Sequence, residues 1–413
     1  MGATRKPPQK QSNGNGNGNG NGSGRARAES HGPHGHDDPF ETTGDHGIDE
    51  AVLITGFPSF TAARMTRKVL AEDARARVYL LARDKFVALA EELLTSLPPS
   101  QRARTQVITG DVCDMDLGLS GSEYRNLAET LTTIHHMAGV YYLGVERKLA
   151  ERVNVDGTRG VIDLARECKR LRRLCHYSSA AVSGKRKGVI LEEELDEGQG
   201  FHNSYEETKF EAEKLARAAQ RQLPVTIFRP GVIVGDSRTG EIDKFDGPYY
   251  LMVLIVQSPL DVHLPLPGRG VAPLHLVPVD YVIDAAYALS RDERAAGGTF
   301  HLVDPMPLSA KQIYALVAER AHKKQPRGFI PTGLAKAIMR TPGLDKLARA
   351  PRAFLEGIDD LSFYNARKTL ELIDGQVRCP PFDSYVDQLI RYVKDVHAAR
   401  RQKLEEETFD PFE

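Results

Sequence analysis

Short apolar runs alternate with amphipathic segments over the first half of the chain. The apolar runs predict buried strands at 51–55, 77–82, 105–109, 132–137, 173–177 and 225–228. Helical spacing of apolar residues predicts helices at 59–72, 85–97, 145–169 and 204–222. Strands that alternate with helices indicate an α/β fold with a parallel sheet covered on both faces. We therefore expect a doubly wound parallel sheet whose ligand lies across the carboxyl ends of its strands.

The pattern loosens from about residue 236 into loops rich in proline and glycine, with further helices expected at 280–290, 309–323 and 383–400. We expect the first domain to comprise 47–235, with 276–303 returning to it. The remaining segments, 236–275 and 304–400, would form a smaller C-terminal lobe over the ligand end of the sheet.

Both ends of the chain have the composition of tails. Residues 1–46 contain an Asn-Gly repeat and scattered histidines, a composition that buries too little surface to fold, so we expect a disordered tail. Residues 401–413 carry five acidic residues against two basic ones, and we expect a short acidic tail there.

Composition excludes several classes of function. The 55 basic and 56 acidic residues balance, so nothing draws the chain as a whole to nucleic acid. The four cysteines have neither metal-like nor disulfide-like spacing, which indicates reduced thiols, no metal site and a cytoplasmic protein. No run approaches the roughly 18 apolar residues of a membrane span, and no secretory signal follows the N-terminal basic residues.

The strongest candidate chemistry lies in the stretch 176–214. Tyr205 and Lys209 are four residues apart on a predicted helix, so both side chains lie on one helical face. A neighbouring ammonium favours phenolate and is expected to lower the pKa of Tyr205, which makes a proton donor and acceptor suited to carbonyl reduction or alcohol oxidation. Ser179, after the strand at 173–177, can polarise the same substrate oxygen.

Ser179, Tyr205 and Lys209 resemble the catalytic triad of the short-chain dehydrogenase/reductases. Asn154-Val-Asp-Gly-Thr158 resembles the NVxGT signature of the extended branch, in which the asparagine holds the active-site geometry, and Arg229-Pro-Gly231 resembles its nicotinamide segment. The resemblance covers about residues 50–305 and implies a Rossmann-type sheet that binds a nicotinamide dinucleotide. It assigns catalytic roles to Ser179, Tyr205, Lys209 and Asn154.

The same resemblance implies a set of cofactor-binding residues at the carboxyl ends of successive strands. They are Thr55, Gly56, Phe57, Pro58, Ser59, Phe60, Arg83, Lys85, Asp111, Val112, Met137, Ala138, Gly139, Tyr205, Lys209, Arg229, Pro230, Gly231 and Val232. Extended members usually have glycine at the positions of Gly56, Ser59 and Ala62, and only the first is glycine here. Ser59 places a side chain where backbone normally meets phosphate, although its hydroxyl and the helix N-terminus can still bind one.

Cofactor preference follows from the end of the second strand. Arg83, with Lys85 nearby, can pair with a 2′-phosphate, which predicts NADP as the cofactor. Asp84 is near enough to accept from a 2′-hydroxyl, so NAD remains open.

Phrases such as VYLLARDK and RPGVIVGDSRTGE resemble the thioester reductase and fatty acyl-CoA reductase-like branch more than the sugar-nucleotide epimerases. This implies reduction of an acyl thioester, on coenzyme A or a carrier, or of another lipophilic carbonyl. Two alternatives stay open: a hydroxysteroid- or nucleotide-sugar-type dehydrogenase or epimerase with the same triad, and a non-catalytic nucleotide-binding protein with a degenerate glycine motif.

Two further partners are expected. The basic segment 327–352 has apolar residues at helix-like intervals, which suits peripheral contact with a membrane surface, although a solvated face over the lobe's core gives the same pattern. Family members often pair through the two long helices that correspond to 145–169 and 204–222, so the resemblance also makes a homodimer an open expectation.

Overall fold

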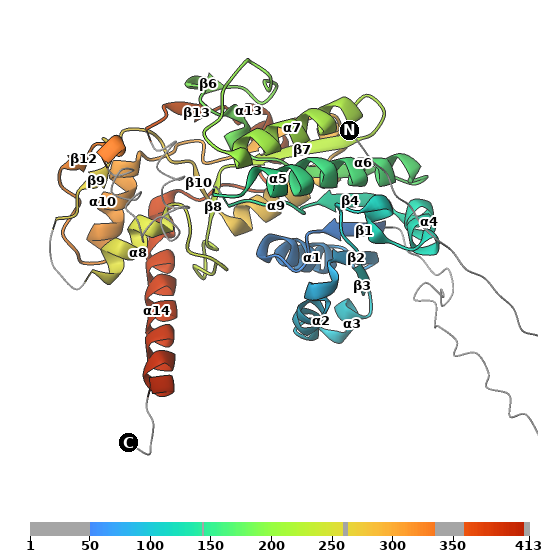
Figure 1. The fold of residues 1–413 in the computed structure, drawn as a ribbon, viewed down its shortest axis with the longest axis horizontal. Coiled ribbons are helices and arrows are strands. Elements are labelled where there is room, and N and C mark those ends of the chain that lie inside the picture. The colour runs from blue at the N-terminus through green and yellow to red at the C-terminus, as the bar shows by residue number, and fades with distance from the viewer. Residues whose placement is uncertain (1–49, 143, 259–262, 335–358, 409–413) are drawn as a thin grey trace, which may run out of the picture. The chain divides into compact units, whose positions relative to one another are not determined.

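A computed structural model of the chain describes residues 50–142, 144–258, 263–334 and 359–408. Its centre is a seven-stranded sheet in the order β11-β7-β5-β4-β1-β2-β3, and each pairing in it is parallel (Figure 1). The strands are β1 (Glu50–Thr55), β2 (Ala76–Ala82), β3 (Thr105–Thr109), β4 (Thr133–His136), β5 (Arg173–Tyr177), β7 (Val225–Pro230) and β11 (Thr299–Leu302). The expected doubly wound sheet is confirmed. Its strand order reverses between β1 and β4, which is where such sheets bind ligands.

Helices cover both faces of this sheet (Figure 1). On one face lie α1 (Phe60–Glu72), α2 (Val87–Thr95), α9 (Val279–Arg291) and α13 (Arg367–Ile373), which share one apolar core with the strands. On the other face lie α4 (Gly121–Thr130), α5 (Arg147–Ala150), α6 (Gly157–Glu167) and α7 (Ser204–Ala219). Along β1, Val52 and Ile54 join the first core while Leu53, between them, points to the opposite face, as strand alternation requires.

The helix expected at 145–169 is not one continuous α-helix, because a π-helical turn at Glu151–Asp156 separates α5 from α6. Two packing demands explain the interruption. Asn154 turns inward to bind the backbone of Val140, and Gly157 lies so close to Val112 that a Cβ would approach its Cγ2 to 2.8 Å. Single π turns inside α-helices are frequent at functional sites.

The C-terminal helix α14 (Val386–Thr408) extends beyond the boundary expected at residue 400. The tail expected from residue 401 is therefore wrong for 401–408, because RQKLEEE consists of good helix formers that continue the helix. The expected N-terminal tail at 1–46, the tail residues 409–413 and most of the basic segment 327–352 lie outside the described residues.

A second core lies beyond the carboxyl edge of the sheet. Residues of α8 (Tyr249–Gln257), α10 (Ala310–Arg320) and α14 pack together there (Figure 1). Two small parallel pairs belong to this part: β8 (Val232–Val234) with β10 (Leu276–Pro278), and β9 (Leu266–Pro267) with β12 (Phe329–Ile330). A third pair joins β6 (Gly188–Ile190) with β13 (Ser362–Tyr364), the strand just before α13. Single helical turns connect other elements, at α3 (Pro99–Arg102), Asp84–Phe86, Met115–Gly118, Ala180–Ser183, Glu293–Ala295 and Phe382–Ser384.

Replacement of Ile54 by Ala should lower the free energy of unfolding by about 2–5 kcal/mol, because its side chain is fully buried in the core between β1 and α1 and its loss leaves a cavity. Urea denaturation followed by circular dichroism measures the change. Leu89→Ala on the exposed side of α2 serves as the control and should change stability by well under that amount. Equal losses in both variants would contradict this account of the core.

Candidate active site

A cavity of about 410 Å³ lies at the carboxyl edge of the sheet, under the C-terminal part of the chain. Ten of the residues predicted from the sequence line it: Ser59, Phe60, Met137, Gly139, Ser179, Tyr205, Lys209, Pro230, Gly231 and Val232. The parallel sheet brings these residues together from the ends of β1, β4, β5 and β7 and from α7, although they lie far apart in the sequence. This cavity is our candidate active site.

Ser179 and Tyr205 meet in the wall of the cavity. Ser179 follows β5 closely, and its Oγ accepts a hydrogen bond of 3.2 Å from the backbone N–H of Ala181, which fixes the side chain at the strand end. Both side chains line the cavity, and the Ser179 hydroxyl is close enough to lower the pKa of Tyr205. A substrate oxygen placed between these hydroxyls would be bound by both, which is the geometry needed to polarise a carbonyl.

Lys209 lies one helical turn after Tyr205, as expected, but its ammonium is directed to the sheet. Its Nζ donates a hydrogen bond of 2.5 Å to the backbone carbonyl of Tyr177, and burial lowers the pKa of Lys209 to about 8. Burial also raises the pKa of Tyr205, and the nearby hydroxyl of Ser179 opposes that rise only in part. The expected lowering of the Tyr205 pKa is therefore wrong, because burial of the phenol raises it while the ammonium of Lys209 is bound to the carbonyl of Tyr177.

Asn154 lies behind the cavity and joins three elements. Its Oδ1 accepts from the backbone N–H of Val140 at 2.8 Å, and its Nδ2 donates to the hydroxyl of Thr208 on α7 at 3.0 Å. A Cβ on Gly139 would lie 3.3 Å from that Oδ1 and 3.9 Å from the Nζ of Lys209. Asn154 thus supports the cavity from behind, close to Lys209, without lining it.

A cluster of polar side chains holds the start of α7 in place, and it was not predicted from the sequence. Asn203 caps the helix by accepting from the backbone N–H of Glu206. His202 lies between two carboxylates, with its Nδ1 3.0 Å from Glu206 and its Nε2 3.0 Å from Asp360. The hydrogen bond to Glu206 raises the pKa of His202, and this cluster ties the segment before β13 to the helix that carries Tyr205.

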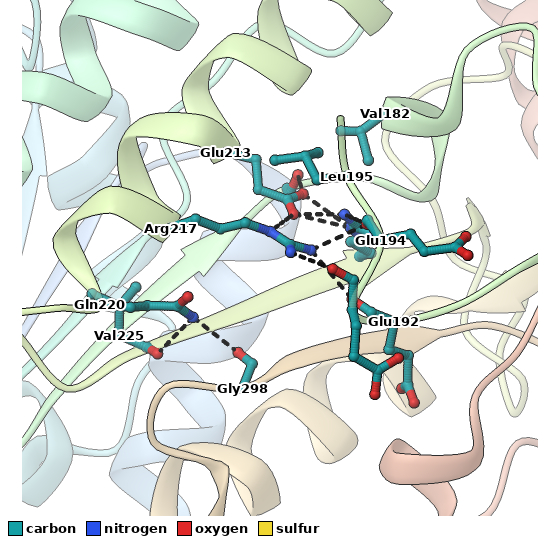
Figure 2. Close-up of polar contacts among 12 residues, drawn as sticks. Val182, Glu192, Glu194, Leu195, Glu213, Arg217, Gln220, Val225 and Gly298 are labelled. Atoms are coloured by element: carbon teal, nitrogen blue, oxygen red, sulfur yellow. Dashed lines mark hydrogen bonds and ion pairs between the residues drawn. The ribbon is translucent and has the colours of Figure 1, made fainter. Parts of the chain in front are cut away.

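Farther along α7, Glu213 is completely buried in a polar network. Figure 2 shows the guanidinium of Arg217 between the carboxylate of Glu213 and the backbone of the segment 192–194. Burial alone would raise the pKa of Glu213, but the charges of Arg229 and Arg217 outweigh it and hold this pKa below its usual value. The carboxylate is therefore ionised inside the protein.

The turn after β1 has the geometry of a phosphate site. Gly56 has φ +83°, and a Cβ there would lie 2.7 Å from the backbone nitrogen of Ala138, so only glycine fits. Ser59 stands at the N-terminus of α1, and its Oγ is buried in the cavity wall without a hydrogen-bond partner in the part of the chain that the structure describes. An unpaired buried hydroxyl at a helix N-terminus suits a phosphate oxygen, so Ser59 fits a dinucleotide pyrophosphate.

Lys209 offers a second fit. Its ammonium has three N–H donors, and one is bonded to the carbonyl of Tyr177. The remaining donors would be able to hold the ribose hydroxyls of a nucleotide bound in the cavity. The residues present therefore fit a nicotinamide dinucleotide.

Some predicted cofactor residues lie along the same edge of the sheet outside the cavity. Arg83 and Lys85 are exposed after β2, each with its cation over the ring of Phe86 at about 5 Å. Asp111 follows β3, and its Oδ1 accepts from the backbone N–H of Cys113, which leaves the other oxygen for an adenine amine. Val112 packs against Gly157.

Other predicted cofactor residues support the cavity from inside the protein. Thr55 accepts from the backbone N–H of Ala138 through its Oγ1, which ties β1 to the end of β4. Phe57 is buried in the core against α1, and Pro58 follows it in the turn before α1. Arg229 does not face the cavity: its guanidinium is buried against Glu213 at 2.7 Å, so the expected contact of its side chain with the cofactor is wrong.

Several cavity residues were missed because they lie outside the motifs recognised in the sequence, four of them in loops, one in α8 and one in β13. They are Tyr141, Lys244, Asp246, Tyr250, His275 and Tyr364. No periodic pattern marks these positions. Glu213 carried a usable signal, since it continues the four-residue spacing of Tyr205 and Lys209.

Comparisons with known proteins place the chain in a family. Residues 54–286 match the NAD-binding family described as "Male sterility protein". The fatty acyl-CoA reductase wat of Drosophila melanogaster is 30% identical over 284 residues, which are 59% of this chain and 54% of the fly protein. A linear gramicidin synthase protein of Brevibacillus parabrevis is 27% identical over 374 residues, which are 84% of this chain and 7% of that protein.

Solved structures show the same fold. The terminal R domain from the myxalamid PKS-NRPS biosynthetic pathway superposes with a TM-score of 0.72 at 24% identity, covering 86% of this chain and 92% of that domain. UDP-glucuronic acid 4-epimerase from Bacillus cereus in complex with NAD gives a TM-score of 0.61 at 16% identity, covering 84% and 96% of the two chains.

The chain therefore belongs to the Male sterility protein family, within the extended short-chain dehydrogenase/reductases, a class of NAD(P)-dependent oxidoreductases. The resemblance to the thioester reductase and fatty acyl-CoA reductase-like branch is confirmed. The chain spans about half the length of the fly relative. Among the described residues, no helix has the length and apolar character needed to cross a bilayer.

The His202 cluster predicts a pH dependence of stability. Because the fold raises the pKa of His202, the stabilisation from Glu206 and Asp360 is complete below the ordinary histidine pKa of about 6.5 and is lost as the pH rises through the raised value. His202→Gln keeps hydrogen-bonding capacity but cannot become charged. Urea unfolding should show a larger loss of stability in His202→Gln at a pH of about 6 than at about 9. A loss that is the same at both pH values would contradict this assignment.

Proposed function

We propose that this protein reduces an acyl thioester, or another lipophilic carbonyl, with NADPH and a Ser179–Tyr205–Lys209 triad. The observation that carries the proposal is the cavity in which the two hydroxyls of Ser179 and Tyr205 meet beside the buried Lys209. The relatives named as a fatty acyl-CoA reductase and as a linear gramicidin synthase, together with the structural match to a terminal R domain, support a thioester substrate.

Each residue of the triad has a defined part in the reaction. A bound reduced nicotinamide supplies a hydride to the carbonyl carbon. Ser179 donates a hydrogen bond to the carbonyl oxygen and stabilises the negative charge that develops there, and Tyr205 donates the proton that this oxygen takes up. The Tyr205 phenol is protonated at neutral pH, as a proton donor in the reductive direction requires, because burial raises its pKa above the ordinary value of about 10.

The product of this step on a thioester is a hemithioacetal. Its collapse reforms the carbonyl, breaks the C–S bond and releases the thiol, which leaves an aldehyde. Lys209 holds the ribose while its ammonium helps Tyr205 to recover a proton, and its pKa of about 8 keeps it largely protonated at neutral pH.

The lining of the cavity suits a lipophilic substrate near the triad. Apolar side chains in the wall include Val140, Ile233 and Leu274. Charged groups lie there too, among them Lys244, which donates to the hydroxyl of Tyr141 at 3.0 Å. The cavity therefore offers an apolar surface for an acyl chain together with polar groups for a carrier or a coenzyme.

Tyr205→Phe should reduce turnover by at least about a hundredfold, because it removes the proton donor and leaves the cavity shape unchanged. Steady-state assays with NADPH and a panel of acyl-CoA thioesters, with aldehyde trapped and quantified, measure this. Titration of nicotinamide fluorescence should show NADPH binding within about twofold of the wild type, since the ring remains in place. Unchanged turnover in the variant would refute the role of Tyr205.

The preference for NADPH is tested at Arg83. Its guanidinium is exposed at the end of β2 beside Phe86, where it can pair with a 2′-phosphate. Arg83→Ala should weaken NADPH binding about tenfold or more and leave NADH binding nearly unchanged, since a charge-assisted hydrogen bond is worth about 1.5–3 kcal/mol. Arg67→Ala on α1, which removes an arginine bonded to Ser96, is the matched control. Equal weakening of both nucleotides by Arg83→Ala would argue against the preference.

A further inference from the structure

We propose that Glu213 is a positioning residue that holds three segments of the active site in register through one buried carboxylate. This inference deepens the proposed function, on which its turnover assay rests. The carboxylate contacts the strand end that carries the catalytic serine and the strand end that leads to the nicotinamide segment, while its own helix carries the tyrosine and the lysine.

The helix spacing places Glu213 on the catalytic face of α7. Tyr205, Lys209, Glu213 and Arg217 follow one another at intervals of four residues, so they form one row along the side of the helix that faces the sheet. Figure 2 shows Glu213 and Arg217 side by side on this row, with Arg217 directed toward the backbone of 192–194. The row therefore runs from Tyr205 at the cavity to Arg217 in the polar network.

The two oxygens of Glu213 bind three neighbouring side chains. Oε2 accepts a hydrogen bond of 2.6 Å from the hydroxyl of Ser178, the residue immediately before Ser179, and one of 3.0 Å from Nε of Arg229. Oε1 accepts from Nη2 of Arg229 at 2.7 Å and from Nε of Arg217 at 2.9 Å. The side chain has no exposed surface, so bulk water does not compete for these bonds.

These contacts reach both strand ends of the cavity. Ser178 fixes the end of β5, from which Ser179 projects toward Tyr205. Arg229 lies in β7, one residue before Pro230, which lines the cavity. A displacement of the buried carboxylate would therefore move the serine, the nicotinamide segment and α7 relative to one another, and displacements of about 1 Å are costly to catalysis.

The charge of Glu213 also acts on Lys209, one turn away. Burial lowers the pKa of Lys209, and the negative charge of Glu213 opposes this effect. Removal of the charge should therefore lower the pKa of Lys209 further.

Two histidines also face Lys209, from the neighbouring strands. His136 at the end of β4 and His176 in β5 are both fully buried, and burial holds the pKa of each far below neutral. Both rings are therefore uncharged over the pH range in which Lys209 titrates. Loss of the Glu213 charge should therefore appear as a change in the pH at which Lys209 loses its proton in alkaline solution.

The first test uses Ser178, because its side chain is small and its loss should not unfold the protein. Ser178→Ala removes the hydrogen bond to Glu213, and kcat for acyl-CoA reduction should fall about tenfold while KM for NADPH stays within about twofold. Ser178→Thr keeps the hydroxyl and should restore most of the activity. Wild-type kcat in Ser178→Ala would overturn the positioning role at the serine.

The second test uses the charge. Glu213→Gln keeps an oxygen that can accept from Ser178 but removes the negative charge, so the alkaline limit of kcat and of NADPH binding should move to lower pH. Gln220→Ala, at the C-terminal cap of the same helix, is the matched control. Gln220 donates to the backbone of Val225 and Gly298, at the opposite ends of the strands, as Figure 2 shows. It should leave both pH profiles unchanged.

Binding of NADPH, followed by nicotinamide fluorescence from neutral to alkaline pH, separates this inference from the proposed reaction. If no thioester is reduced by the wild type but the alkaline limit of binding still moves in Glu213→Gln, the reaction is wrong and the positioning role stands. If the alkaline limit of NADPH binding does not move in a folded Glu213→Gln variant, the proposed role of Glu213 is overturned. If Glu213→Gln does not fold, as judged by circular dichroism, the comparison of Ser178→Ala with Ser178→Thr decides, by turnover or by the pH profile of binding.

Discussion

Parallel pairing of the central strands is the constraint on which the whole site depends. Because β1, β4, β5 and β7 run in one direction, their carboxyl ends meet at one edge of the sheet. Ser59, Met137, Ser179 and Pro230 reach the cavity for this reason, although they lie far apart in the sequence. The parallel backbone places the strand ends side by side at this edge, and the side chains at those ends supply the chemical groups.

At this edge of the sheet, burial affects the pKa values of the side chains more strongly than the helical spacing of Tyr205 and Lys209 does. The sequence shows that Tyr205 and Lys209 share a helical face, and from that spacing alone an ammonium beside a phenol is expected to lower the phenol's pKa. In the fold, both groups lose water, and the ammonium binds a carbonyl oxygen of β5. A bound nucleotide would therefore enter a site where the acid is protonated before the substrate arrives.

The sequence allowed prediction of the sheet and of most of its helices, because short apolar strands and amphipathic helices carry periodic signals. It allowed prediction of Ser179, Tyr205 and Lys209 because a motif links them. The role of Arg229 was not predictable, since its burial depends on a carboxylate in another element. Asp360 was not predictable for a related reason: it approaches α7 only through tertiary packing, far later in the chain.

The π turn at Glu151–Asp156 has a consequence for how this chain can vary. A π turn contains about one residue more than an α turn, and one residue rotates a helix by about 100°. The faces that α5 and α6 present are therefore set by the length of this stretch. Substitutions there change single contacts, whereas deletion of one residue would rotate Asn154 away from Val140 and Thr208 and turn the apolar side of one helix toward solvent. The packing thus tolerates changes of composition in this turn more readily than changes of its length.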